Sequence, residues 1–368
     1  MLNRSARGDV AERAFRRLRL GRLLLEIRLE VSPLRQFIVI GLAILLGLLI
    51  SAAILIAVGI PPGALWEEFV LDTVFDLQNL HSVWFLAGPL TFIGLAAAIA
   101  FRCGFWNLGL EGQMMWGGIA GTFVSLHHVG PEQLRILTML AAAILAGAFW
   151  VMLPAFLKWR FAVNEIISTL LLNYVAFYFL VYLLFGPWLD PRDGFPHSPN
   201  YAPFERLPDL PGGFSSIVPL ALAGALLIAW LVLASRFGLY VRFISDNPLA
   251  ALAVGVPIGT VTLLAIALSG AMAGFGGEAI LTGTEGRLTY TYFPGYGFSG
   301  VLIAFLARNN PLGVVAVAVL VAILFVAGQN LQIFFQIPGS MVQVIEAIMV
   351  FSVASAEFFL RHRLHWVR

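Results

Sequence analysis

The sequence has 368 residues and a formal net charge of +2, and 60% of its residues are hydrophobic while only 11% are charged. Soluble domains carry about 25% charged residues, so this composition excludes an ordinary soluble protein and indicates an integral membrane protein. One cysteine excludes an internal disulfide, and the six histidines have no HxxxH or HExxH spacing, so we expect no metal site. The single lysine, Lys158, lies outside any phosphate-binding P-loop, which excludes ATP hydrolysis by that route and predicts no cofactor in this chain.

Hydropathy divides the chain into a basic cytosolic arm (residues 1–36), a transmembrane region (37–360) and a basic cytosolic tail (361–368). The predicted fold is all-α, a polytopic helical bundle of about ten spans, some of them broken or re-entrant. The spans are predicted at 37–60, 84–101, 105–126, 134–157, 163–186, 216–234, 259–276, 297–307, 311–328 and 341–360. The span at 297–307 covers only about half a bilayer at roughly 1.5 Å per residue, which favours a re-entrant or broken helix there.

An even number of spans places both termini on one side of the membrane. That side then receives 18 of the 22 basic residues, which identifies it as the cytosol. The long proline-rich loop 187–215 lies outside the cell and separates five spans from five. Two such halves have opposite orientations, as in transporters built from inverted repeats, so this topology predicts an inverted repeat of five plus five.

The first polar motif is "GFWNLGLEGQMMWGG", residues 104–118, which interrupts two apolar stretches. Its polar residues are Asn107, Glu111 and Gln113. If the segment is helical, Asn107 and Glu111 share a face while Gln113 points elsewhere. These side chains either line a solute pathway or form a hydrogen-bond network that holds a broken helix in shape. Gly117 and Gly121 form a GxxxG pair that lets another helix approach closely.

The second motif is "NEIISTLLLNY", in which Asn164 is expected to cap the following helix. Glu165, Thr169 and Asn173 follow at i, i+4 and i+8 and align along one helical face, which predicts a wall of the solute pathway. For Glu165 the alternative is a structural role in the first helical turn near Lys158. Tyr174 is a candidate for stacking on a planar solute, although aromatic residues within a span more often serve packing.

The third motif is "SDNPLAALAVGVPIG", within the predicted cytosolic segment 235–258. The Asn-Pro pair predicts a helix start and the glycine a helix stop, giving a helix too short to cross a membrane. Such a helix suits either coupling to a soluble motor protein or simple attachment at the membrane surface. The candidate coupling residues are Asn247, Pro248, Leu249, Leu252 and Gly255.

Several segments together resemble one family, the permease subunits of bacterial ABC importers for nucleosides and simple sugars. The branch is the one that uses a basic-membrane-lipoprotein type of binding protein, within the branched-chain amino acid and ribose permease superfamily. The matching segments are "FRCGFWNLGLEGQMMWG", "VNEIISTLLLNYVAFYFLVYLLFGPW", "GFPHSPNYAPFERLP", "AVGVPIGTVTLLAIALSGAMAGFGG" and "GYGFSGVLIAFLARNNPLG". By this resemblance Asn107, Glu111, Gln113, Asn164, Glu165 and Asn173 match positions characteristic of the family.

The resemblance implies a multi-pass subunit of the bacterial cytoplasmic (inner) membrane that acts in transport and is not itself an enzyme. It implies three partners: an ATPase with two nucleotide-binding domains that binds ATP and Mg, a second related permease, and an extracytoplasmic substrate-binding lipoprotein. No nucleic acid is expected as a partner. A nucleoside is the predicted solute and a simple sugar the alternative. Two other classes stay open: a proton-coupled secondary transporter with Glu111, Glu165 and Glu346 as its relay, and, less favoured, an intramembrane enzyme.

Overall fold

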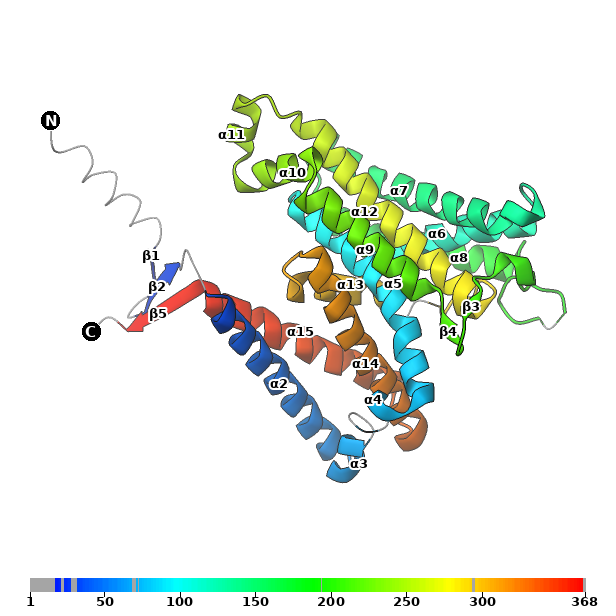
Figure 1. Ribbon diagram of the computed structural model, residues 1–368, viewed down its shortest axis with the longest axis horizontal. Coiled ribbons are helices and arrows are strands. Elements are labelled where there is room, and N and C mark those ends of the chain that lie inside the picture. Colours follow the sequence, from blue (N-terminus) through cyan, green and yellow to red (C-terminus); the bar gives the residue numbers. More distant parts are fainter. Residues whose placement is uncertain are drawn as a thin grey trace. The chain divides into compact units, whose positions relative to one another are not determined.

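The computed structural model describes residues 17–20, 23–27, 32–67, 71, 73–192, 194–292 and 295–366. These residues are mostly helical, as the composition predicts, and most of the strand residues pair in one small sheet (Figure 1). The chain divides into two compact units. The first joins Met1–Leu65 to Phe335–Arg368, and the second is Trp66–Phe334.

The first unit is built on two long helices, α2 (Pro33–Ala57) and α15 (Gly339–Arg361), which pack against each other. Ser32 caps α2, its hydroxyl accepting a hydrogen bond from the Arg35 backbone N–H. The short helix α3 (Pro62–Trp66) follows α2. The strands β1 (Arg17–Leu20), β2 (Leu23–Ile27) and β5 (His362–Trp366) form an antiparallel sheet in the order β1-β2-β5. The predicted basic arm and tail thus contribute strands to one sheet.

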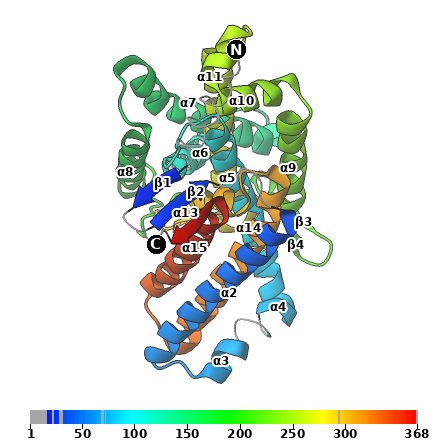
Figure 2. The same cartoon turned by 90° about the vertical axis from the view of Figure 1, so that its left-hand side faces the viewer.

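The second unit contains the remaining helices and a two-stranded hairpin. Its elements are α4 (Thr73–Phe75), α5 (Leu77–Arg102), α6 (Leu110–Leu126), η2 (Glu132–Leu134), α7 (Arg135–Phe161), α8 (Glu165–Phe185), η3 (Pro203–Glu205), β3 (Asp209–Leu210), β4 (Phe214–Ser215), α9 (Ile217–Leu233), α10 (Arg236–Asp246), α11 (Pro248–Ala253), α12 (Ile258–Ile280), η4 (Leu281–Glu285), α13 (Tyr296–Leu306) and α14 (Pro311–Phe335). Within this unit α8 and α9 lie on opposite sides of the core helices (Figure 2).

The core of the second unit forms where α12 packs against α5, α6 and α7 (Figure 1). Glycines allow backbone to touch backbone there: Gly117 of α6 lies against Gly274 of α12, and Gly147 of α7 lies against both Gly270 and Gly274. Such contacts between small residues are the usual basis of helix association in membranes. The prediction that Gly117 admits a second helix is therefore confirmed, and the helix is α12.

The ten-span count is not confirmed. Among the described residues, six helices are long and apolar enough to cross a membrane, or seven if α9 and α10 count as one bent span. α13 has 11 residues, as short as predicted. α6 has only 17, because residues 105–109, predicted as its first turn, are not helical. Without ten spans of full length, the inverted repeat is not confirmed either.

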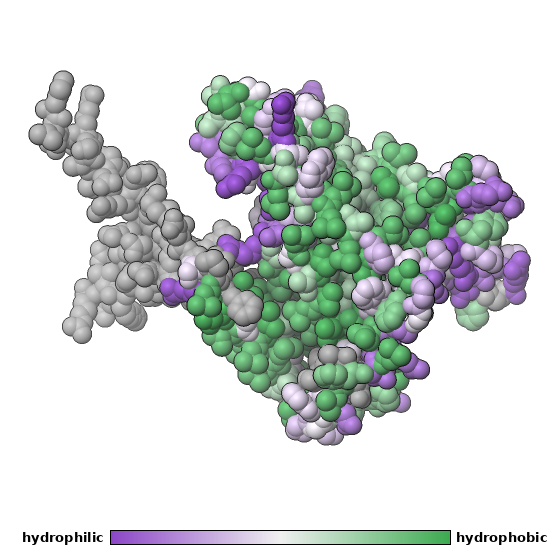
Figure 3. All heavy atoms as spheres, in the orientation of Figure 1, coloured by the Kyte–Doolittle hydropathy of each residue, from purple (hydrophilic) through white to green (hydrophobic). Residues whose placement is uncertain are grey.

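The second unit has an apolar belt between two polar ends. In Figure 3 hydrophilic side chains gather at the α10–α11 end and again at the opposite end, with a hydrophobic surface between them. The outward faces of α7 and α8 carry large exposed hydrophobic side chains, such as Leu145, Phe149 and Leu171. Exposed apolar surface of this extent is typical of a multi-pass membrane protein in contact with lipid.

The glycine contacts generate a stability prediction. Gly274→Ala should lower the thermal unfolding temperature of the purified protein, because the added methyl group overlaps the Ala143 backbone and overpacking costs about 1–3 kcal/mol. Gly259→Ala in the same helix is the matched control, since no atom lies within 4 Å of the new methyl group. It should leave the temperature unchanged or raise it slightly. Equal effects of the two variants would contradict close α7–α12 packing.

Candidate functional site

The polar residues of the first motif hold a non-helical turn in place between α5 and α6. Asn107 is fully buried, and its amide nitrogen donates to Gln113 Oε1 at 3.0 Å and to Ser269 Oγ of α12 at 3.0 Å. Gln113 Nε2 and the Gly109 backbone N–H both donate to Asn107 Oδ1, at 2.8 and 3.1 Å. The Ser269 hydroxyl in turn donates to the Ala96 carbonyl oxygen of α5. One asparagine thereby links three helices.

The structure corrects the predicted pairing in this motif. Asn107 is not on a helix, so it does not share a face with Glu111, and its partner is Gln113, which was predicted to point elsewhere. Glu111 is half-buried in the first turn of α6 and packs against Gly297 of α13. The reason is local: Gly104 has φ +73°, a left-handed conformation that ends α5 and redirects the chain before α6 begins.

The polar stripe of α8 binds the same turn from the other side. The Asn164 side chain caps α8 as predicted, accepting from the Ile166 N–H. Thr169 Oγ1 accepts from the Leu108 N–H at 3.2 Å, while Asn173 donates to the Leu108 carbonyl oxygen and accepts from the Gly112 N–H, both at 2.9 Å. Both side chains are buried against residues 108–112. Both side chains are therefore engaged in hydrogen bonds within the chain.

Glu165, the first residue of the stripe, forms an ion pair with Lys158 at the end of α7, with Oε1 and Nζ 2.5 Å apart. Lys158 Nζ also donates to the Gly104 carbonyl oxygen at 3.4 Å. The Glu165 side chain is 13% exposed and the Lys158 side chain 40% exposed, so the pair lies at an edge of the bundle that is partly accessible to solvent. Glu165 thus has the structural role that its position in the first turn allows.

Tyr174 lies on the opposite face of α8 and is exposed. Tyr178 and Tyr182 follow it at i+4 and i+8, so the three phenol rings form one row along a membrane-crossing helix. Their exposed fractions are 58, 67 and 65%. Tyr178 and Tyr182 contact the rings of Phe177 and Phe179 of the same helix, but more than half of each tyrosine side chain stays exposed. A hydroxyl facing lipid tails would have no hydrogen-bond partner, which disfavours lipid as the neighbour of this row.

The third motif folds as predicted. Asn247 caps α11, its side-chain oxygen accepting from the Leu249 and Ala250 N–H groups at 3.1 Å each, and Pro248 is the first helical residue. Gly255 has φ +81°, which ends the segment. Leu249 and Leu252 lie three residues apart on one face of α11, and 80 and 62% of their surfaces are exposed. These leucines are available to a neighbouring protein.

A second polar cluster was missed by the sequence analysis. Its centre is Glu278 of α12, which is fully buried and has no hydrogen-bond partner for either carboxyl oxygen among the described residues. The carboxyl group lies directly against Gly121 of α6, where any added side chain would overlap it. Glu278 belongs to "GFGGEAI" and lies two residues beyond the predicted span 259–276. An acidic residue close to an apolar run is the signal that could have identified it.

The loop between α8 and α9 closes this cluster. Tyr201 is buried and its hydroxyl lies 2.6 Å from Thr122 Oγ1 of α6; because Thr122 donates to the Gly118 carbonyl oxygen, Tyr201 is the donor between the two. Burial raises the pKa of the Tyr201 hydroxyl well above its usual range, so it stays protonated. Glu205 accepts from Ser125 Oγ at 2.8 Å and pairs with Arg135 at 3.7 Å. The loop is therefore a folded cap on the bundle.

Residues 79–354 match the family model described as the permease component of branched-chain amino acid transport systems. The chain belongs to this permease family.

Three similar proteins are named as ABC transporter permeases. The chain is 35% identical to a glucose ABC transporter permease of Haloferax volcanii over 88% of each protein. It is 30% identical to a guanosine ABC transporter permease of Bacillus subtilis, over 89% of this chain and 95% of the relative. A nucleoside ABC transporter permease of Lactococcus lactis is 24% identical over 87% of this chain and 91% of the relative. The family predicted from the sequence motifs is thus confirmed, and its members are transport subunits.

In this permease, the two faces of α8 predict different effects of two neighbouring substitutions on stability. Asn173→Leu should lower the thermal unfolding temperature, because it leaves the Leu108 carbonyl and the Gly112 N–H buried without partners, at about 1–3 kcal/mol for each unsatisfied group. Tyr174→Leu should leave that temperature nearly unchanged, since the side chain is exposed. A larger loss of stability in Tyr174→Leu than in Asn173→Leu would refute the division of α8 into two faces.

The two buried glutamates predict a second contrast. Glu278→Met should keep or raise the unfolding temperature, because it removes a buried polar group that has no hydrogen bond in the structure. Glu205→Met should lower the unfolding temperature, because the Arg135 charge is left unpaired in the interior. The expected loss of unfolding free energy is about 3–5 kcal/mol. Thermal unfolding of both variants in detergent measures the difference. If Glu278→Met is less stable than Glu205→Met, the prediction is wrong and the Glu278 carboxyl group has a stabilising partner beyond the described contacts.

Proposed function

We propose that this chain is the permease subunit of an ABC importer in the bacterial cytoplasmic membrane, where it translocates a nucleoside. A partner ATPase with two nucleotide-binding domains binds ATP and Mg, and an extracytoplasmic lipoprotein delivers the solute. Family membership supports the transport role. Four relatives, two from Bacillus subtilis and two from Lactococcus lactis, are named for guanosine or nucleoside transport. Because each of these organisms has two such permeases, a second related permease is proposed as the neighbour of this chain.

The observation that carries the proposal is the tyrosine row of α8. Tyr174, Tyr178 and Tyr182 are exposed along a helix whose other face is fixed to the turn before α6. We assign this row to the wall of the solute passage, between this chain and the second permease. Phenol rings offer flat apolar faces for a nucleobase and hydroxyls for its polar edge or for the ribose. Asn107, Gln113, Thr169 and Asn173 then act behind the wall and hold α8 in position.

A simple sugar is the second candidate solute, because the glucose permease relative has 35% identity to this chain. Exposed aromatic rings also suit the apolar face of a sugar, so the tyrosine row does not separate the two solutes. A proton-coupled secondary transporter has less support. Of its three proposed relay residues, Glu165 is engaged with Lys158. The side chain of Glu346 lies outside the described part of the structure.

We further propose that α11 receives the movement of the ATPase. Leu249, Leu252 and Val254 expose 80, 62 and 71% of their surfaces, and none of the described apolar elements of the second unit covers them. α11 has only six residues between its Asn247 cap and the left-handed Gly255, so it is held at both ends as a short rigid projection. Exposed leucines on a short rigid helix suit a hydrophobic cleft on a partner protein.

Uptake measurements test this function. The transporter, purified from native membranes through this chain, is reconstituted into vesicles and supplied with labelled guanosine or labelled glucose, with and without enclosed ATP. We expect uptake of guanosine that needs ATP. Tyr174→Leu should lower uptake with little change in stability. The double variant Leu249→Asp, Leu252→Asp should abolish it, because charged side chains cannot enter an apolar cleft without a large desolvation penalty.

Leu210→Asp, on the exposed β3–β4 hairpin at the other end of the unit, is the control for the added charge and should leave uptake intact. Accumulation of glucose and not guanosine would mean that the solute is a sugar and that the nucleoside assignment is wrong. Uptake that continues without ATP and collapses with an uncoupler would overturn the ABC importer itself.

A further inference from the structure

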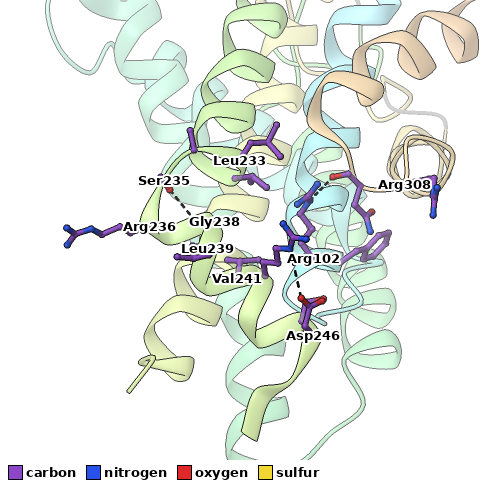
Figure 4. Close-up of a pocket in the computed structure, with 15 residues that line it drawn as sticks. Arg102, Leu233, Ser235, Arg236, Gly238, Leu239, Val241, Asp246 and Arg308 are labelled. Atoms are coloured by element: carbon purple, nitrogen blue, oxygen red, sulfur yellow. Dashed lines mark hydrogen bonds and ion pairs between the residues drawn. The ribbon is translucent and has the colours of Figure 1, made fainter. Parts of the chain in front are cut away.

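A basic cavity of about 930 Å³ lies at the corner between α9 and α10. Three separate parts of the second unit line it: the end of α5, the α9–α10 corner, and the turn after α13 (Figure 4). Its charged residues are Arg102, Arg236, Arg242, Arg308 and Asp246. All four arginines belong to the set that the charge distribution of the sequence places on the cytosolic side. The cavity therefore has an excess of positive charge at the cytosolic end of the membrane region.

The corner itself is built to be sharp. α9 and α10 meet at 65° across a short break. Ser235 caps α10, accepting from the Gly238 N–H at 3.2 Å, and its hydroxyl donates to the Leu231 carbonyl oxygen. Gly238 lies so close to the Val232 backbone that no larger residue fits there. The bend turns α10 away from the direction of α9 and leaves the cavity on its inner side.

α10 packs one side against the bundle and exposes arginines on the other. Gly238, Val241 and Ile244 are buried against neighbouring helices, while Arg236 and Arg242 are exposed. Exposed arginines beside a membrane are attracted to anionic lipid headgroups. The position of α10 after the apolar helix α9 and a sharp bend suits the headgroup level.

The positive charges of Arg102 and Arg242 are not fully neutralised by acidic residues of the cavity lining. Arg102 donates through Nε to the Asn309 carbonyl oxygen at 2.7 Å, which fixes its guanidinium at the cavity, and the charge of Arg242 is close enough to act on it. Asp246 is the single acid of the lining and lies 4.0 Å from Arg242, with both side chains more than 70% exposed. Such an exposed pair is weak. An anion between Arg102 and Arg242 would relieve their repulsion.

The arginines decide which anion the lining suits. A guanidinium group carries several N–H donors whose geometry matches the oxygens of a phosphate. The lining thus suits an anion that carries a phosphate group.

We propose that this cavity binds the phosphate of an anionic lipid of the cytosolic leaflet. Arg102 and Arg242 hold the phosphate, and the acyl chains extend along the apolar surface beside α9. Bound lipid fixes the α9–α10 corner and with it the start of α11. The site is separate from the solute passage proposed along α8.

Lipid retention and thermal unfolding of the full chain test the proposal. The protein in nanodiscs of phosphatidylglycerol should unfold at a higher temperature than in phosphatidylcholine, and native mass spectrometry should detect retained phosphatidylglycerol. The double variant Arg102→Gln, Arg242→Gln should weaken this binding by roughly thirtyfold, since each basic residue near an anionic surface contributes about a fivefold factor. Arg160→Gln, an exposed arginine at the end of α7 outside the cavity lining, is the matched control and should bind as the unaltered protein does.

The proposal is overturned if the double variant retains as much phosphatidylglycerol as Arg160→Gln, or if phosphatidylcholine stabilises the protein equally. Inorganic phosphate added in detergent distinguishes the source of the anion. Stabilisation by inorganic phosphate alone, lost in the double variant, would mean that the site binds a free phosphate and that the lipid assignment is wrong. Because these measurements need neither solute nor ATPase, their outcome is independent of the transport experiments.

Discussion

Non-helical backbone inside a membrane bundle must find its hydrogen bonds within the protein, because lipid tails offer none. Residues 103–109 meet this requirement with side chains from two other helices. The N–H and the carbonyl oxygen of Leu108 are bound by Thr169 and Asn173 of α8, and the Gly109 N–H is bound by Asn107, which Ser269 of α12 holds. The positions of α6, α8 and α12 thus depend on one short turn.

This requirement explains how α8 divides its residues between structure and transport. The polar side chains of α8 that the sequence predicts as solute contacts are engaged within the chain: Thr169 and Asn173 bind backbone groups of residues 108–112, and Glu165 pairs with Lys158. Tyr174, which the sequence analysis names as a candidate for stacking on a solute, remains exposed together with Tyr178 and Tyr182. In a water-soluble protein an exposed aromatic row would favour aggregation, whereas in a membrane subunit it can face a passage or a second chain. Function is therefore better sought opposite the polar stripe than on it.

Local signals in the sequence were sufficient for much of the fold. Each predicted span contains a helix, and the caps at Asn164 and Asn247 and the stop at Gly255 follow from short-range rules. Long-range contacts could not be predicted in this way. Asn107 was paired with Glu111 because residues 105–109 were assumed to be helical, and helical spacing fails once the backbone leaves the helix. The helix that contacts Gly117 lies more than 150 residues away in the sequence, where no periodicity indicates it.

The two ends of the second unit use charge in opposite ways. At the α10 end, arginines surround an open cavity and remain partly accessible, so they can exchange one anionic partner for another. At the other end, Glu205 of the loop pairs with the buried Arg135, and Glu278 is buried without a hydrogen bond among the described residues. A buried carboxyl group without a hydrogen bond costs stability, which makes Glu278 a candidate for a functional role. The loop residues Tyr201 and Glu205 close the cluster around it, so this role depends on the same residues that fold the loop onto the bundle.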